Sequence, residues 1–287
     1  MLLDTCIRNK VLTQKDKMSN SVLIRGGGDL ATGVAYRLHK AGLRVVITEL
    51  PQPLSVRRKV SFSEAVYDDE ITVEGVTAKL AKTVADIEKL FAKNIVPVLI
   101  DPKLDILDES IPFPIIVDAR LTKRPPDLPL ASAKLIIGLG PGFTAPKDCH
   151  AVIETNRGHT LGRVYWEGSA MADTGLPEQV LGIRAERVLH APADGELITY
   201  GDIGDHFDKG DTIAEVAGIP LMAPFIGSLR GLLRPGLLVK KGLKVGDLDP
   251  RDDPRFCTMI SDKSLALGGA VLEAILSQVE IRKALWA

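Results

Sequence analysis

The chain has 287 residues and a formal net charge of −1, with 36 Lys and Arg against 37 Asp and Glu. Because the two signs are mixed along the chain, the composition argues against nucleic acid and against an anionic membrane surface as partners. No apolar run reaches the ~18 residues of a membrane helix, and Cys6, Cys149 and Cys257 form neither a disulfide framework nor a zinc pattern. These features favour a globular protein in the reducing cytoplasm.

We expect residues 1–20 to be a flexible extension that precedes the fold. The segment lacks the long apolar core of a signal peptide and contains acidic residues. Met18 stands shortly before the first clear strand, so the fold is expected to begin near residue 21.

A strand–helix–strand unit is predicted for residues 21–49. Residues 21–25 form an apolar strand, residues 30–41 have helical periodicity, and residues 44–48 form a second strand that ends at Glu49. Between the first strand and the helix, Gly26, Gly28 and Ala31 match the pattern G-x-G-x-x-[G/A]. In that pattern the first glycine permits a tight turn, the second lets the backbone approach a pyrophosphate, and the third residue allows close packing.

This unit predicts a Rossmann-type cofactor site. The N–H groups and the positive dipole end at a helix start attract anionic oxygen. An acid about 20 residues after the first glycine binds the ribose of NAD in such sites, and Glu49 lies near that distance. The candidate cofactor-binding residues are Gly26, Gly27, Gly28, Asp29, Ala31 and Glu49. The alternative is that the glycines only turn the chain, and Asp29 departs from the usual pattern because its carboxylate would cap the helix or repel a phosphate.

Two arginines follow the second strand, in the stretch PQPLSVRRKVSFSE. Arg57 and Arg58 would lie at the edge where ligands bind in open α/β sheets, so they are candidate partners for a phosphate or carboxylate. A solvated basic turn is the alternative.

Further strand signals lie at residues 71–73, 95–100, 114–117 and 134–137, with a helix over residues 84–91. This alternation predicts an α/β domain over residues 21–170, with a Rossmann-like, mostly parallel sheet and helices on both faces. The last strand runs into GLGPGF, where Gly138, Gly140 and Gly142 form a second anion-binding nest or an ordinary tight turn.

The stretch DCHAVIETNRGHTLG brings Arg157 and His159 close together in the sequence. Both are candidate ligand-binding residues for an anion, and buried structural roles are the alternative. The spacing of Cys149, His150 and His159 fits no standard zinc pattern, so no metal site is expected.

Residues 188–249 contain an internal repeat without gaps. Ala191-Pro192 recurs as Ala223-Pro224, and Gly195 recurs as Gly227. The repeat predicts a doubled β domain over residues 186–252, which resembles the barrel-sandwich hybrid of biotinyl and lipoyl carriers. No lysine lies between Lys209 and Lys240, so neither biotin nor lipoate is expected. Residues 260–287 are expected to contain a final helix that packs on the α/β domain.

The stretches RGGGDLATG, PQPLSVRRKVSFSEAV, GLGPGFTA and VIETNRGHTLGRV, with DPR further along, together resemble the YqeB-type proteins. These are assigned to the selenium-dependent molybdenum hydroxylase system and are related to the XdhC/CoxI accessory family. The resemblance implies an accessory or maturation factor that handles molybdopterin or a nucleotide, with a xanthine dehydrogenase-like molybdenum hydroxylase as its partner. Pro146 and Asp173 depart from the family pattern, which puts the second glycine loop in doubt.

Two other functions fit the same residues. An NAD-dependent oxidoreductase would use NAD(P) at the first glycine loop, and a non-enzymatic docking protein would carry an empty Rossmann fold. The sequence assigns no catalytic residue and does not decide between an enzyme and a binding protein. It is also compatible with a homo-oligomer.

Overall fold

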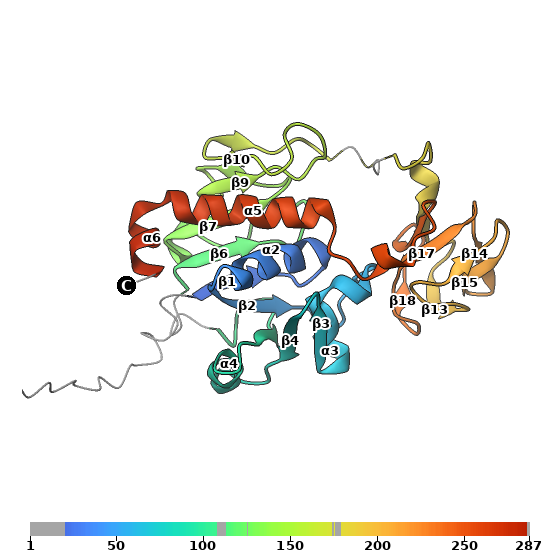
Figure 1. Cartoon of the computed structure of the whole chain (residues 1–287), viewed down its shortest axis with the longest axis horizontal. Coiled ribbons are helices and arrows are strands. Elements are labelled where there is room, and N and C mark those ends of the chain that lie inside the picture. Colours follow the sequence, from blue (N-terminus) through green and yellow to red (C-terminus); the bar gives the residue numbers. More distant parts are fainter. Residues whose placement is uncertain (1–20, 108–112, 125, 174, 176–178, 286–287) are drawn as a thin grey trace, which may run out of the picture.

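The computed structural model describes residues 21–285, except for 108–112, 125, 174 and 176–178. The predicted flexible extension, residues 1–20, lies outside the described residues. The chain forms two regions that stand side by side (Figure 1). The α/β region contains residues 21–170 and the C-terminal helices, and the β region contains residues 188–249.

The α/β region is built on one nine-stranded sheet in the order β10-β9-β7-β6-β1-β2-β5-β4-β3. Its central strands pair in parallel, and only β10 and β3, at the two edges, pair antiparallel. The strands are β1 (Ser21–Arg25), β2 (Arg44–Glu49), β3 (Glu70–Val73), β4 (Val76–Leu80), β5 (Val96–Ile100), β6 (Ile115–Asp118), β7 (Leu135–Leu139), β9 (Ala151–Ile153) and β10 (Val164–Tyr165). A separate two-stranded sheet joins β8 (Thr144–Ala145) to β11 (Gly168–Ser169).

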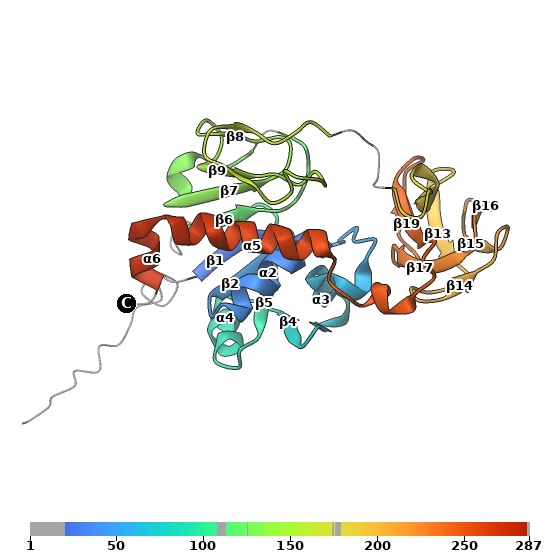
Figure 2. The same cartoon turned by 45° about the horizontal axis from the view of Figure 1, so that its top comes forward.

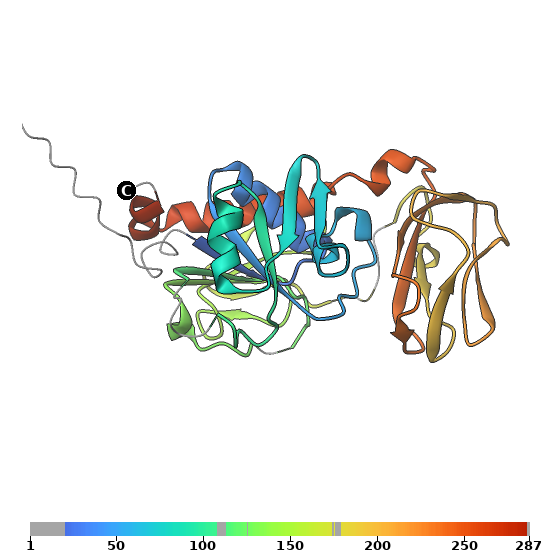
Figure 3. The same cartoon turned by 90° about the horizontal axis from the view of Figure 1, so that it is seen from below.

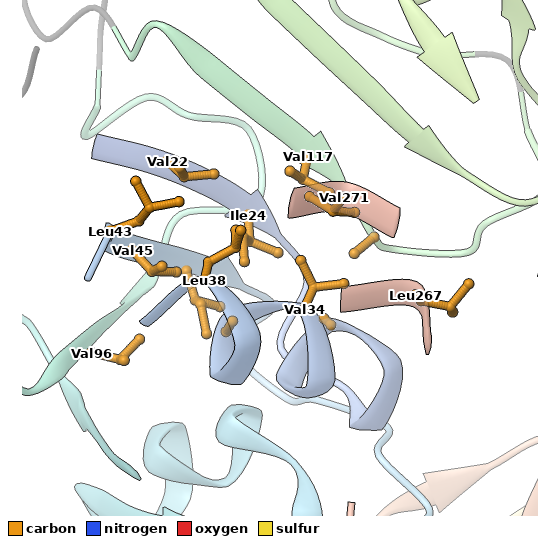
Figure 4. Packing of buried hydrophobic residues seen from close by; sticks show 14 of the residues in the cluster. Val22, Ile24, Val34, Leu38, Leu43, Val45, Val96, Val117, Leu267 and Val271 are labelled. Atoms are coloured by element: carbon orange, nitrogen blue, oxygen red, sulfur yellow. The ribbon is translucent and has the colours of Figure 1, made fainter. Parts of the chain in front are cut away.

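One face of the large sheet packs against α2 (Asp29–Lys40) and α5 (Asp262–Ser277). Val34 and Leu38 of α2 and Leu267 of α5 are buried in this layer (Figure 4). The two helices run alongside each other (Figure 2) and approach closely at two glycines. A Cβ atom on Gly33 would lie 2.5 Å from Ser264, and one on Gly268 would lie 2.5 Å from the carbonyl oxygen of Gly33. Gly268 is therefore a close-packing site, whereas Gly269 is exposed.

On the other face of the sheet, the described residues form one short helix, α4 (Val84–Phe91). Ile87 and Leu90 of this helix pack with Leu23 and Leu99 of the sheet. Loop residues such as Phe143 cover the rest of this layer. The connection from β2 to β3 carries only short helices, namely the 3₁₀-helices η1 (Arg58–Val60) and η2 (Phe62–Glu64) and the α-helix α3 (Ala65–Asp68).

The predicted Rossmann-like fold is wrong, although the large sheet is mostly parallel and carries helices on both faces. Besides the large sheet, the chain forms three further sheets whose strand pairs are all antiparallel. Within the described residues, the connections from β6 to β7 and from β7 to β9 contain no α-helix and only one short turn, η3 (Leu130–Ser132). Pro126 and Pro129 lie in the first of these connections, and proline opposes a helix because it lacks a backbone donor.

The β region consists of two four-stranded antiparallel sheets, in the orders β12-β19-β17-β14 and β16-β15-β13-β18 (Figure 3). The strands are β12 (Val188–His190), β13 (Gly195–Thr199), β14 (His206–Phe207), β15 (Thr212–Val216), β16 (Ile219–Met222), β17 (Gly227–Leu232), β18 (Leu238–Val239) and β19 (Lys244–Asp249). The sequence repeat makes each of the first four strands the counterpart of one of the last four. Replacing every strand by its counterpart converts one sheet order into the other, so the repeat makes the two sheets equivalent.

Short segments connect the two regions. The linker ends in η4 (Ala185–Arg187), and η5 (Pro254–Cys257) precedes α5. The backbone of Val56 accepts a hydrogen bond from the N–H of Leu232, and the guanidinium of Arg234 binds Glu64 and Asp68.

The sequence predicted one final helix, but the structure has two, because α6 (Val279–Leu285) is bent by 99° from α5. No single helix in the described part of the chain is long and apolar enough to cross a membrane, and only this bent pair passes that test.

Candidate functional site

A cavity of about 360 Å³, which we call the edge cavity, opens at the carboxyl ends of β1, β2 and β6. The first turn of α2 forms part of its wall. The structure brings five of the sequence-predicted residues together there, namely Gly26, Gly28, Asp29, Ala31 and Glu49. They meet because β1 and β2 are adjacent parallel strands, whose carboxyl ends share one edge of the sheet.

The three glycines of the first loop have different surroundings. Gly26 has φ +96°, which favours glycine, and the backbone of Ala119 and Arg120 lies 3.3 Å from where its Cβ would be. A Cβ on Gly27 would lie 2.9 Å from the backbone nitrogen of Ser63. Gly28, the N-cap of α2, has only the Ser55 hydroxyl within 4 Å of its Cβ position, at 3.7 Å. Gly26 and Gly27 are therefore required by packing, whereas Gly28 faces open space in the cavity.

The Glu49 carboxylate lies on the cavity wall and is held by backbone. It accepts hydrogen bonds of 2.7 Å from the N–H of Gly27 and of 2.7 Å from the N–H of Leu50. Burial raises the pKa of Glu49, and these two N–H groups partly offset the rise. A carboxylate offers about four lone-pair sites, so Glu49 retains capacity for a hydroxyl donor of a ligand.

The structure places Arg57 and Arg58 at contacts within the protein. The buried Arg57 pairs with Asp29 at 3.2 Å and donates to the carbonyl oxygens of Phe256 and Met259. Arg58 donates to the carbonyl oxygen of Leu232 and pairs with Asp202, both in the β region. Neither arginine is among the residues that line the edge cavity. For the Asp29 carboxylate the sequence left two alternatives open, a helix cap or repulsion of a phosphate. In the structure its charge is balanced by Arg57.

Sequence reasoning missed a charged cluster at one side of the edge cavity. Arg25 is buried, and its guanidinium binds Asp127 and approaches Asp118 to 3.6 Å. Arg120 lines the cavity and binds the carboxylates of Asp118 and Asp127. Burial alone would lower the pKa of Arg120, but these hydrogen bonds raise it. The charged residues at the ends of β1 and β6 could have indicated this cluster from the sequence. Nothing in the sequence indicated Asp127, because it lies in a loop without a motif.

The second glycine loop has packing roles. Phe143 lies 2.3 Å from the Cβ position of Gly138, and Thr155 lies 2.6 Å from that of Gly140. Gly142 has φ +111° and packs beside the backbone of Arg124. A cavity of about 240 Å³ lies next to this loop and shares Leu30 and Leu121 with the edge cavity.

The remaining candidates lie apart. Arg157 pairs with Asp262 through two contacts of 2.5 and 2.8 Å. His159 is exposed. His150 accepts a hydrogen bond of 2.9 Å from the N–H of Ile136, and burial raises the pKa of Cys149 to about 11. Among the described residues, no group of three or more His, Cys, Asp or Glu side chains is arranged to hold a metal ion.

Comparison with known proteins found a relative in Escherichia coli (strain K12) that carries the name Uncharacterized protein YqeB. The two sequences are 47% identical over 255 residues, which is 89% of this chain and 47% of the relative. The chain thus spans about half the length of the curated relative that it matches. This match confirms the predicted resemblance to YqeB-type proteins. No family model matches the chain.

The similar solved structures include an aspartoacylase family protein of Mesorhizobium loti and a succinylglutamate desuccinylase/aspartoacylase of Rhodobacter sphaeroides. The first is 8% identical, with a TM-score of 0.22 over 80% of this chain and 56% of that chain. The second is 15% identical, with a TM-score of 0.25 over 80% of this chain and 85% of that chain. At these TM-scores the likeness assigns neither a fold nor an activity to this chain.

The predicted function needs a correction. The prediction of a maturation factor for a selenium-dependent molybdenum hydroxylase is not retained: the relative in Escherichia coli carries a name that states no function, and the similar structures carry aspartoacylase and desuccinylase names. The two alternatives, an NAD-dependent oxidoreductase and a docking protein with an empty Rossmann fold, presupposed the Rossmann-like fold and are not retained either.

Proposed function

We propose that this chain binds a small organic ligand in the edge cavity, with a hydroxylated part of the ligand at Glu49 and an anionic group at the N-terminus of α2. The observation that carries the proposal is the open space in front of Gly28, the N-cap of α2, within a cavity of about 360 Å³. Cavities of roughly 300–1,000 Å³ with few polar groups are typical of small-molecule sites.

The α2 N-terminus supports binding of an anionic group. The first N–H groups of a helix have no partner inside the helix, and the dipole places positive charge there. Asp29 stands in this first turn, but Arg57 pairs with its carboxylate, so Asp29 does not cancel the attraction. Because Gly28 has no side chain, a ligand can reach the backbone at this point.

The apolar part of the wall supports binding of a ring or another apolar group. Leu30, Leu50 and Leu54 line the cavity, and Leu50 and Leu54 are 46% and 47% exposed. Apolar side chains with this exposure can bury further surface when a ligand covers them.

Several finer statements stay predictions. NAD(P) and molybdopterin remain the cofactors expected from the sequence, and each carries hydroxyl or phosphate groups that match the proposed chemistry. The relation to the XdhC/CoxI family, the selenium-dependent system and a molybdenum hydroxylase partner rests on the sequence resemblance alone.

Native mass spectrometry of the protein and of the Gly28→Leu variant tests the proposal. The leucine side chain starts in open space and extends into the cavity, so it should exclude the ligand without disturbing the backbone. We expect a bound small-molecule mass on the wild-type chain and none on the variant.

The matched control is Gly269→Leu, which adds the same side chain at an exposed position of α5. This variant should retain the bound mass. Retention of the ligand by folded Gly28→Leu, checked by circular dichroism, would place the ligand elsewhere and refute the proposal.

A further inference from the structure

Two arginines at the wall of the edge cavity share a carboxylate that comes from the loop between β6 and β7. Arg120 lines the cavity, and the neighbouring Arg25 is buried, with 2% of its side chain exposed. We call these two residues the arginine pair. Arg120 donates to the two oxygens of Asp127 at 2.9 Å each, and Arg25 donates to the same carboxylate. Arg25 also donates to the carbonyl oxygen of Pro102, which lines the cavity, so the pair stands at the cavity wall.

The two carboxylates that face the arginine pair are held differently. Asp118, at the end of β6, is 5% exposed and accepts from the backbone N–H of Arg120 at 3.3 Å as well as from its side chain. Asp127 is 55% exposed, and in the described part of the chain it accepts from the two arginines but from no backbone N–H. Because exposed ion pairs contribute little stability, Asp127 can be replaced at small cost, whereas Asp118 belongs to the fixed wall.

Asp127 balances the charge of the arginine pair. Two guanidinium groups face two carboxylates in this cluster, so the cluster is neutral while Asp127 is in place. The hydrogen bonds from Arg120 and Arg25 hold the pKa of Asp127 well below its usual range, so Asp127 is charged at neutral pH. Without Asp127 the pair would face Asp118 alone, and one positive charge would remain beside the cavity.

We propose that the ligand of the edge cavity carries a carboxylate that binds the arginine pair in place of Asp127. The Nη1 and Nη2 atoms of Arg120 donate to separate oxygens of Asp127, which is the fork geometry that matches a planar carboxylate. The exposed side chain of Asp127 can rotate into solvent when another carboxylate takes this position.

This inference rests on the proposed function and narrows its ligand class. The ligand is then a hydroxylated small molecule with two anionic groups, one at the N-terminus of α2 and a carboxylate at the arginine pair. The buried Nε of Arg25, which has no acceptor among the described residues, adds to the positive character of this wall.

Titration of the whole protein with sodium acetate, followed by nuclear magnetic resonance of the Arg120 and Asp127 signals, tests the inference. Acetate reproduces the carboxylate and the Cβ atom of Asp127, and sodium chloride of equal ionic strength corrects for salt effects. Acetate should bind Asp127→Ala about tenfold tighter than the wild type or more, because the competing carboxylate is gone. Adding Arg120→Gln to Asp127→Ala should abolish this gain. If Asp127→Ala does not fold, Asp127→Asn keeps the shape and gives the same comparison.

The matched control is Asp194→Ala in the β region. Asp194 is 58% exposed and pairs with Lys240, so this variant removes the same charge at the same exposure but far from the arginine pair in the fold. It should bind acetate like the wild type. The inference is wrong if Asp194→Ala gains as much affinity as Asp127→Ala, since the attraction would then be general electrostatics. It is equally wrong if the Arg120 signals of the wild type do not respond to molar acetate, because Asp127 would then not be displaced.

The inference and the proposed function can fail separately. The acetate titration does not involve the N-terminus of α2, and the Gly28→Leu comparison does not involve Asp127. Acetate binding as expected, together with a ligand that folded Gly28→Leu retains, would refute the proposed function and leave a carboxylate site at the arginine pair. Ligand loss from Gly28→Leu without any acetate response would support the proposed function and refute this inference.

Discussion

Packing glycines occur in both regions of this molecule, whereas Gly28 of the α/β region faces open space. In the β region, Gly227 and Gly231 lie where two backbones meet. A Cβ on Gly227 would lie 2.4 Å from the carbonyl oxygen of Asp249, and one on Gly231 would lie 3.0 Å from the carbonyl oxygen of Val56. In the α/β region, Gly33 and Gly268 have the same use between two helices. Gly28 differs from all of them, because no backbone stands in front of it.

This difference allows a packing glycine to be distinguished from a ligand-binding glycine by substitution. Substituting a packing glycine should destabilise the fold, whereas substituting Gly28 should leave the fold intact and remove only a ligand. The following predictions test the packing glycines of both regions and then an ion pair of α5, from the largest expected effect to the smallest.

Gly33→Ala should have the largest effect on stability. Its Cβ would meet the Cβ, the backbone carbon and the oxygen of Ser264 at 2.5–2.6 Å, so α5 would have to move away from α2. Overpacking of this kind costs about 1–3 kcal/mol, and we expect about 3 kcal/mol in urea-induced unfolding. Gly269→Ala is the matched control in α5 and should stabilise by about 0.5–1 kcal/mol, because its Cβ meets nothing. Equal effects of the two substitutions would contradict the close helix contact.

Gly227→Ala should destabilise the β region by about 2 kcal/mol, within the same overpacking range. The added methyl would meet the backbone of β19, which cannot shift without losing its pairing with β17. Hydrogen exchange measured by mass spectrometry should show faster exchange in β17 and β19 and unchanged exchange in β1 and β2. Faster exchange throughout the chain would show that the two regions do not respond separately.

Asp262→Asn should have the smallest effect, and that effect should depend on pH. The hydrogen bond from Arg157 lowers the pKa of Asp262 from 3.8 to about 2. Because the folded-state pKa is depressed, the stabilisation is present above pH 3.8 and is lost as the pH falls towards 2. The Asp262 side chain is 76% exposed, so solvent screening limits the effect to less than about 1 kcal/mol. Unfolding curves from pH 7 to pH 2 should show the wild type and the variant converging at the acid end, and a gap that stays constant would contradict the ion pair.

The edge cavity was largely predictable because its signals are local. Gly26, Gly28 and Glu49 belong to one strand–helix–strand unit, and parallel neighbours bring their carboxyl ends to one edge. The doubling of the β region could also be predicted from the sequence, because the repeat has no gaps.

The helices of the α/β region and the partners of its charged residues were not predictable in the same way. The sheet strands were expected to alternate with helices, yet Pro126 and Pro129 belong to a connection whose described residues contain no α-helix. Arg57 looked like a ligand-binding residue, but its partners include Met259, far away in the sequence. Likewise, nothing local in the sequence marks Arg187 and Arg230 as neighbours, since the fold alone brings them together.

The most direct test of the central claim is a comparison of amide chemical shifts by nuclear magnetic resonance, between the protein as purified and the protein refolded from guanidinium chloride without its ligand. A ligand in the edge cavity should shift mainly the amides of Gly26, Gly28, Ala31 and Glu49, which line it. Identical spectra, or shifts confined to the β region, would contradict a ligand at the N-terminus of α2.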